Sequence, residues 1–129
     1  MSIQKLISPD FDVQVEITYN SGESNPENNF HFFNYKIKIH NKSNFSAQLL
    51  SRHWIITDGH GKVEEVRGPG VVGLQPKIPS GKFFEYESGC PLTTSSGSMT
   101  GSYQMMSEDG QNFDIQIPEF YLVAPTALH

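Results

Sequence analysis

The chain has 129 residues, of which 36% are hydrophobic and 18% charged, and its formal net charge at pH 7 is −5. This length suits one domain with its own core. The acidic balance argues against a nucleic-acid or anionic-membrane partner, because both require a basic protein face. The single cysteine excludes an internal disulfide, and no apolar run is long enough to span a membrane, so we expect a cytoplasmic protein.

Alternating apolar and polar residues open the chain. The alternation over residues 11–19 predicts a strand with one face toward water. Residues 20–29 are polar and rich in turn formers, which predicts a loop. Alternation returns over residues 30–41, with Phe33, Tyr35 and Ile37 on one side. Because polar residues connect the two stretches, we expect an antiparallel pair.

Residues 45–57 form the longest apolar stretch and carry the only tryptophan, Trp54. The side on which apolar residues fall changes near Leu49 and Leu50, which predicts a β-bulge or a strand buried on both faces. Asp-Gly at residues 58–59 then predicts a tight hairpin turn. The charged return stretch, residues 62–67, is expected to be an edge strand.

The rest of the chain continues the pattern. Residues 74–81, which include Pro76 and Pro79, are rich in turn formers. Residues 90–97 are expected to form a loop. Strands are predicted near residues 83–87, 99–105 and 113–117, with a hairpin turn at residues 108–111. About seven to nine short strands without a helical period predict an all-β fold, an antiparallel β-sandwich of the immunoglobulin or fibronectin type III kind.

This sandwich is expected to be a single domain with its core at about residues 8–122. The residues expected in the core are Val15, Ile17, Tyr35, Ile37, Trp54, Ile56, Tyr86, Tyr103 and Ile115. Tyr103 is predicted either to form a tyrosine corner, in which its hydroxyl bonds the main chain upstream, or to be an ordinary core aromatic.

A glycine motif suggests nucleotide binding at first sight. Gly68, Gly70 and Gly73 spell G-x-G-x-x-G, which binds a pyrophosphate where a helix N-terminus follows. Pro76 and Pro79 exclude that helix. We therefore expect a loop whose glycines supply positive φ, with weak anion binding by its backbone N–H groups as the alternative.

Candidates for metal and catalytic chemistry are few. His53, Asp58 and His60 surround one predicted turn and form a weak metal candidate, although exposed turn residues are the simpler interpretation. None of the five histidines, His31, His40, His53, His60 and His129, has a partner at H-x-x-x-H spacing. Cys90 has no assigned base and is expected to be an inert thiol. No catalytic residue and no cofactor is predicted.

Four ordered motifs carry a resemblance to a known family. They are R-H-W-I-I-T-D-G-H-G (residues 52–61), V-x-G-x-G-V-V-G-x-Q-P (66–76), F-x-Y-x-S-G-C-P-L (84–92) and G-x-M-x-G-x-Y-x-M (97–105). Over about residues 8–120 the chain resembles the ApaG family, also called CorD. Ser95 departs from the pattern, which usually has proline there.

The resemblance implies an immunoglobulin-like or fibronectin type III sandwich and no catalytic residues. It also implies a link to cobalt resistance and magnesium efflux. Related domains are attached to eukaryotic F-box and polymerase-interacting proteins, which suggests that the domain binds partners.

Two functions remain. The first is a non-catalytic module that binds an unidentified protein partner. The second is binding of a small ligand (a pyrophosphate or nucleotide) or of a divalent metal at the loop from Gly68 to Gly73 or at the turn with His53 and His60. The sequence has neither the carboxylate cluster that hard Mg²⁺ prefers nor the paired imidazoles that Co²⁺ prefers, and this favours the first function. Phe30 and Phe32 share the face opposite Phe33, and exposed aromatics there predict a weak homodimer.

Overall fold

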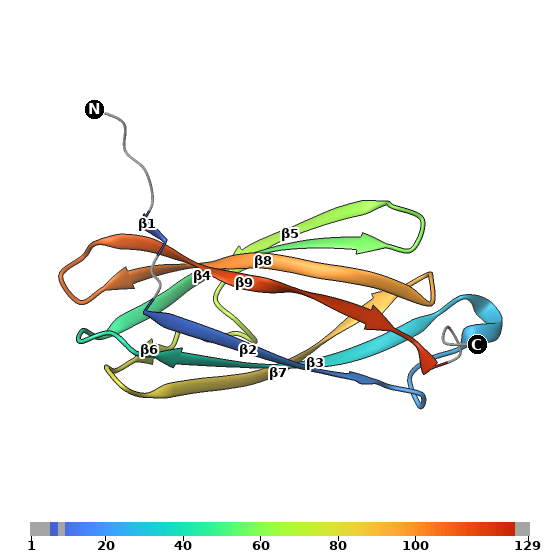
Figure 1. Ribbon diagram of the computed structural model, residues 1–129, viewed down its shortest axis with the longest axis horizontal. Coiled ribbons are helices and arrows are strands. Elements are labelled where there is room, and N and C mark those ends of the chain that lie inside the picture. Colours follow the sequence, from blue (N-terminus) through green and yellow to red (C-terminus); the bar gives the residue numbers. More distant parts are fainter. Residues whose placement is uncertain (1–5, 8–9, 126–129) are drawn as a thin grey trace.

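The computed structural model describes residues 6–7 and 10–125, and these form a sandwich of two β-sheets (Figure 1). One sheet has the strand order β1-β9-β8-β4-β5, with β6 beside β4, and the other has the order β2-β3-β7. The elements are β1 (Leu6–Ile7), β2 (Phe11–Tyr19), the short 3-10 helix η1 (Pro26–Asn28), β3 (His31–Asn41), β4 (Ala47–Asp58), β5 (Val63–Pro69), β6 (Lys77–Ile78), β7 (Phe83–Leu92), β8 (Ser96–Ser107) and β9 (Asn112–Val123).

The predicted fold class is confirmed. Every strand pair is antiparallel except β1 with β9, which is parallel. Among the long strands, three pack against four, an arrangement of the fibronectin type III kind. The predicted start of the core at residue 8 and the histidine at position 129 lie outside the described residues. No helix in the described part of the chain is long and apolar enough to cross a membrane.

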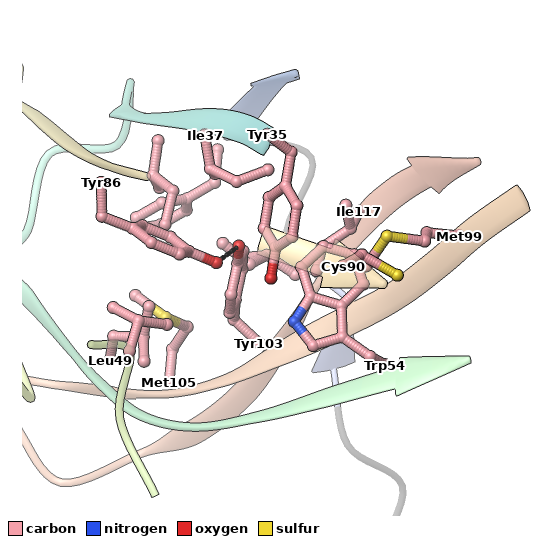
Figure 2. Packing of buried hydrophobic residues seen from close by; sticks show 14 of the residues in the cluster. Tyr35, Ile37, Leu49, Trp54, Tyr86, Cys90, Met99, Tyr103, Met105 and Ile117 are labelled. Atoms are coloured by element: carbon pink, nitrogen blue, oxygen red, sulfur yellow. Dashed lines mark hydrogen bonds between the residues drawn. The ribbon is translucent and has the colours of Figure 1, made fainter. Parts of the chain in front are cut away.

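The core lies between the sheets and is rich in aromatic rings (Figure 2). Six of the nine expected core residues are buried, namely Tyr35, Ile37, Trp54, Tyr86, Tyr103 and Ile115. Val15, Ile17 and Ile56 are only partly buried and pack against the core from its margin. The first two lie on β2, which is an edge strand, so water reaches one flank of their side chains.

The predicted bulge in β4 is confirmed. The pairing of β4 with β8 shifts register between Leu49 and Ser51. Opposed residues of paired strands share a face. After the bulge Arg52 pairs with the fully buried Tyr103, so Arg52 points between the sheets together with Trp54.

Two local predictions were wrong in detail. The hairpin between β4 and β5 is present, but its positive φ falls at Gly61 (85°), whereas the Gly59 N–H donates to Thr94 Oγ1 at 2.8 Å. The turn is therefore longer than the predicted two-residue form. The expected loop at residues 90–97 is also shorter, because residues 90–92 end β7 and residues 96–97 begin β8.

Of the two alternatives for Tyr103, the core aromatic is confirmed, since the residue is fully buried, and the tyrosine corner is not formed. The Tyr103 hydroxyl makes a 2.5 Å hydrogen bond with the Tyr86 hydroxyl, and no bond to the main chain is present among the described residues (Figure 2). Since Tyr86 belongs to β7 and Tyr103 to β8, this bond joins the two sheets through the core.

Candidate functional site

One edge of the sandwich contains two adjoining hollows between β5 and β7. The first, of about 370 Å³, lies toward the β4–β5 turn, and the second, also of about 370 Å³, lies toward the glycine loop. Tyr35, Arg52 and Ser88 line both hollows, so we treat them as one β5–β7 groove. Trp54, Ile56, Glu64, Val66, Cys90 and Pro91 line the first hollow, and Val72, Gly73 and Tyr86 line the second.

The groove exists because β5 extends beyond the opposite layer. Six of the seven residues of β5 are exposed, and only Gly68 is partly buried. Val66 pairs with the buried Trp54 and therefore points toward the inside of the sandwich, yet it is 38% exposed. In Figure 1 the far end of the β4–β5 hairpin stands apart from the layer formed by β2, β3 and β7. An apolar side chain is thus left uncovered on an inward face.

Arg52 is the central charge of the groove. Its Nη1 donates hydrogen bonds to the carbonyl oxygens of Pro69, at 3.0 Å, and Gly70, at 2.9 Å. A Cβ atom on Gly68 would lie 3.0 Å from both terminal guanidinium nitrogens. The first glycine of the motif therefore leaves room for the guanidinium group to cross β5 and reach these carbonyls.

The other two motif glycines also have structural reasons. Gly70 has a φ of 61°, and a Cβ atom there would lie 2.2 Å from the Leu74 carbonyl oxygen. Gly73 has a φ of 80°, which L-residues with side chains rarely adopt. The chain after Gly73 forms no helix and continues into the short strand β6.

Val72 is strained. Val71 and Leu74 exchange two backbone hydrogen bonds, of 2.8 and 2.9 Å, so Val72 and Gly73 form the tip of a tight turn. Val72 has a φ of 43°, an outlier for a β-branched residue. Its side chain is 55% exposed and lines the second hollow. Such strain concentrates at functional positions, so this end of the groove is a candidate for a functional role.

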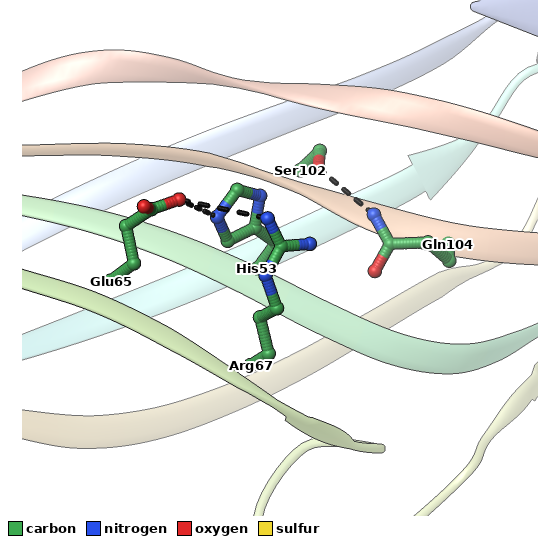
Figure 3. A network of polar contacts seen from close by, with 5 residues as sticks. All are labelled: His53, Glu65, Arg67, Ser102 and Gln104. Carbon is green, nitrogen blue, oxygen red and sulfur yellow. Dashed lines mark hydrogen bonds and ion pairs between the residues drawn. The ribbon is translucent and has the colours of Figure 1, made fainter.

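His53 and Asp58 point to opposite sides of the sheet. His53 Nε2 lies 2.7 Å from Glu65 Oε1 on the outer face, and Arg67 Nη2 lies 3.6 Å from the same oxygen (Figure 3). Asp58 lies five residues along β4, roughly 16 Å away for an extended chain, and lines the groove.

Asp58 is used by the turn itself. Its Oδ1 accepts the backbone N–H groups of Lys62 and His60, each at 2.9 Å. The bond from Lys62 is the main reason that the pKa of Asp58 is lowered. The structure thus does not bring the side chains of His53 and Asp58 together. Within residues 6–7 and 10–125, no group of three or more His, Cys, Asp or Glu could hold a metal ion.

Cys90 lies in the wall of the groove but is only 3% exposed. Burial, and to a smaller extent the nearby negative charge of Glu64, raises its pKa to about 11. The protonated thiol therefore dominates at neutral pH, and a thiol is a poor nucleophile. Burial also raises the pKa of Tyr103 and of Tyr86, so both hydroxyls stay protonated.

Of the two aromatic residues that were predicted to form a self-association surface, one packs within the domain. The rings of Phe30 and Phe32 stack with centroids 6.5 Å apart, and Phe30 is 38% exposed. A Cβ atom on Gly89 would lie 2.2 Å from the Phe32 ring, so this ring packs directly on the β7 backbone. Phe30 is the part of the pair that remains available for a contact.

The groove was missed by sequence reasoning. It depends on how far the two sheets overlap, which no local pattern records. A partial signal was present at Arg52, because it lies two residues before Trp54 on the same strand and therefore shares its side.

The fold and this edge groove define an immunoglobulin-like β-sandwich domain of the fibronectin type III kind. The family model described as the ApaG domain matches residues 21–107, about two thirds of the chain. The chain belongs to this family.

Relatives and a solved structure agree with this membership. Protein ApaG of Bdellovibrio bacteriovorus is 58% identical over 127 residues, covering 98% of this chain and 100% of the relative. Protein ApaG of Pseudomonas putida is 52% identical over 118 residues, covering 92% and 94%. A crystal structure of a protein described as ApaA from Bordetella pertussis is 45% identical, has a TM-score of 0.88, and the match covers 93% of this chain and 98% of the other.

Proposed function

We propose that this ApaG-family domain is a non-catalytic module that acts in the cytoplasm by binding a protein partner in the β5–β7 groove. One observation carries the proposal: an inward-facing apolar residue, Val66, is left 38% exposed beside a positive charge, Arg52, at an unsealed edge. Exposed apolar surface next to placed polar groups is characteristic of interaction sites.

The link to cobalt and magnesium handling, which the family resemblance implies, is proposed to act through this contact and not through chelation. Two of the three candidate donors support this view because their side chains already serve the fold. His53 bonds Glu65 on the outer face, and Asp58 binds the backbone of its own turn.

Site-specific photo-crosslinking in native cells tests the proposal. We would place p-benzoylphenylalanine at Val66, in the groove, and at Gln116, an exposed residue of β9 outside it, as the matched control. A discrete adduct from position 66 that is absent from position 116 is expected. Equal adducts from both positions, or none from position 66, would contradict partner binding in the groove.

A further inference from the structure

The free edge of β7 has unpaired backbone groups. The Phe32 N–H donates to Ser24 Oγ at 2.8 Å and its carbonyl accepts from the Asn20 N–H at 2.8 Å, so Phe32 does not bond its opposed residue Pro91. Bonded and non-bonded pairs alternate along an antiparallel ladder. The N–H and C=O groups of residues 85, 87 and 89 therefore point away from β3, and no hydrogen bond within the described part of the chain uses these N–H groups.

The layer that contains β7 is one strand narrower than the opposite layer at this edge. The smaller sheet ends at β7, whereas the larger sheet has β5 as one further strand beyond β4. The β5–β7 groove lies in the corner between them, lined by side chains from β4, β5 and β7. A strand added beside β7 would lie under the inward face of β5 and cover Val66. The shape of the groove therefore matches an extended chain.

Charges on the two faces of β7 would select the sequence of a strand that is added beside it. On the inner side, Arg52 has no carboxylate within 4.0 Å among the described residues, and its hydrogen bonds go to two carbonyl oxygens. On the outer side, Glu85 is shared by Lys36 and Lys38 at 3.6 and 3.8 Å, whereas the exposed Glu87 has no cation within that distance in the described part of the chain. The inner side thus favours an acidic residue and the outer side a basic one.

We propose that β7 accepts an extended segment of the partner protein as an additional strand of its sheet. The side chains that point inward follow the order apolar, acidic, apolar: the acidic one meets Arg52 beside Ser88, and the apolar ones fill the hollows at Val66 and at Val72. The side chains between them point outward and are basic, beside Glu87. This inference rests on the proposed function and names the chemistry of the partner.

A second copy of this chain fits the edge less well. Two β7 strands paired with each other would bring the Glu85 and Glu87 carboxylates of both copies onto one face, and like charges opposed across strands are destabilising. A small carboxylic acid would satisfy Arg52 but would leave the backbone groups of β7 unpaired. Both remain outcomes that the test separates.

The test uses a fluorescent peptide, acetyl-Thr-Val-Lys-Glu-Lys-Val-Thr-amide, and fluorescence anisotropy with the full chain. We expect saturable binding. N-methylation of the residues whose N–H groups face β7 should weaken the affinity at least tenfold, whereas methylation of the alternate residues should not. Failure to bind, or equal effects of both methylation sets, overturns strand addition.

The charges are tested by matched exchanges. Arg52→Gln should weaken binding of the Glu peptide about tenfold but leave a peptide with Gln at that position unchanged, which a loss of folding would not do. Glu87→Lys should weaken binding of the peptide with lysines and strengthen binding of a peptide with Glu at both outward positions. Identical effects on all peptides would overturn the assignment.

Three further results separate the alternatives. Binding of propionate with the same dependence on Arg52 and the same affinity as the peptide would indicate a small-acid site and overturn the proposal. A concentration-dependent dimer that Glu87→Lys strengthens would indicate pairing between copies and overturn it too. A crosslinked partner at position 66 without peptide binding would retain the proposed function and reject strand addition.

Discussion

The two long edges of the sandwich differ in how they are sealed. At one edge β2 packs against β9, and Phe11, Phe45 and Phe113 meet with ring centroids 5.4 to 6.3 Å apart. At the other edge no strand of the described part of the chain covers β5, and Val66 remains 38% exposed above Arg52. The difference teaches that aromatic area stabilises the closed edge, whereas the open edge leaves apolar surface and charge uncovered, which is where the proposed partner would bind.

Truncations at the two edges give the largest expected contrast. Phe113→Ala removes a ring that is only 4% exposed and should cost roughly 3–5 kcal/mol of unfolding free energy. Val66→Ala removes little buried area and should change it by about 0.5 kcal/mol or less. Urea unfolding followed by Trp54 fluorescence measures both. Similar losses at the two edges would refute the contrast.

The reactivity of Cys90 tests how dry the wall of the open edge is. With a pKa of about 11 instead of 9.0, the thiolate fraction at pH 8 falls about 100-fold. Alkylation by iodoacetamide should be slower in the folded protein by at least that factor than in concentrated urea. Comparable rates in the two conditions would show that water enters between the sheets at β7.

The bond between Tyr86 and Tyr103 should hold the sheets together midway between the two edges. Replacing either tyrosine with phenylalanine leaves a buried hydroxyl unpaired and should cost about 1–3 kcal/mol, whereas the double replacement should cost less than the sum. A double-mutant cycle measures this coupling. Additive losses would mean that the hydroxyl pair contributes nothing.

The same pair predicts a pH dependence. Burial raises both tyrosine pKa values above the value of about 10 in the unfolded chain, so the folded state keeps protons that the unfolded state releases. Stability should be complete below pH 10 and fall as the pH rises above it. Urea midpoints near pH 8 and pH 11 measure the fall, which the double phenylalanine variant should reduce. An unchanged fall in that variant would assign it to other groups.

Divalent ions should have the smallest effect. Tight binding, with the ion at 100 times its dissociation constant, would add about 2.7 kcal/mol of stability. Because His53 and Asp58 lie on opposite faces of β4, we expect no measurable rise of Tm in 1 mM Co²⁺ or Mg²⁺. Thermal melts of the parent, His53→Ala and His60→Ala proteins decide this. A rise that either variant abolishes would establish direct chelation.

Most of the fold could be predicted because its signals are local. Alternation placed the long strands, and the shift of apolar side near Leu49 located the bulge that the structure contains. The short strand β6 was missed because two residues between Pro76 and Pro79 carry no alternation, although Ile78 is buried and pairs with Ala47. The last residues of β7 were missed because Pro91 suggested a loop. On an edge strand, however, a missing N–H is harmless.

The groove could not be predicted because it depends on non-local geometry. Alternation tells which residues face inward, but not that β5 extends beyond the opposite layer of described strands. For the same reason residues 62–67 were predicted only as a charged edge strand, and the exposure of the apolar Val66 was not predicted. The sequence also could not pair the hydroxyls of Tyr86 and Tyr103, since that contact joins β7 and β8 across the core.

If the proposed partner binds in the groove, the strained turn at Val72 sets the stability of the protein against that binding. Asparagine or glycine would relax a φ of 43° at this position. Selection for heat resistance alone would therefore replace Val72, and the hollow beside Arg52 would lose part of its apolar wall. Engineered thermostable versions of this domain are thus expected to trade partner affinity for robustness at this residue. A directed-evolution experiment with two separate screens, one for survival on heating and one for peptide capture, would drive position 72 in opposite directions.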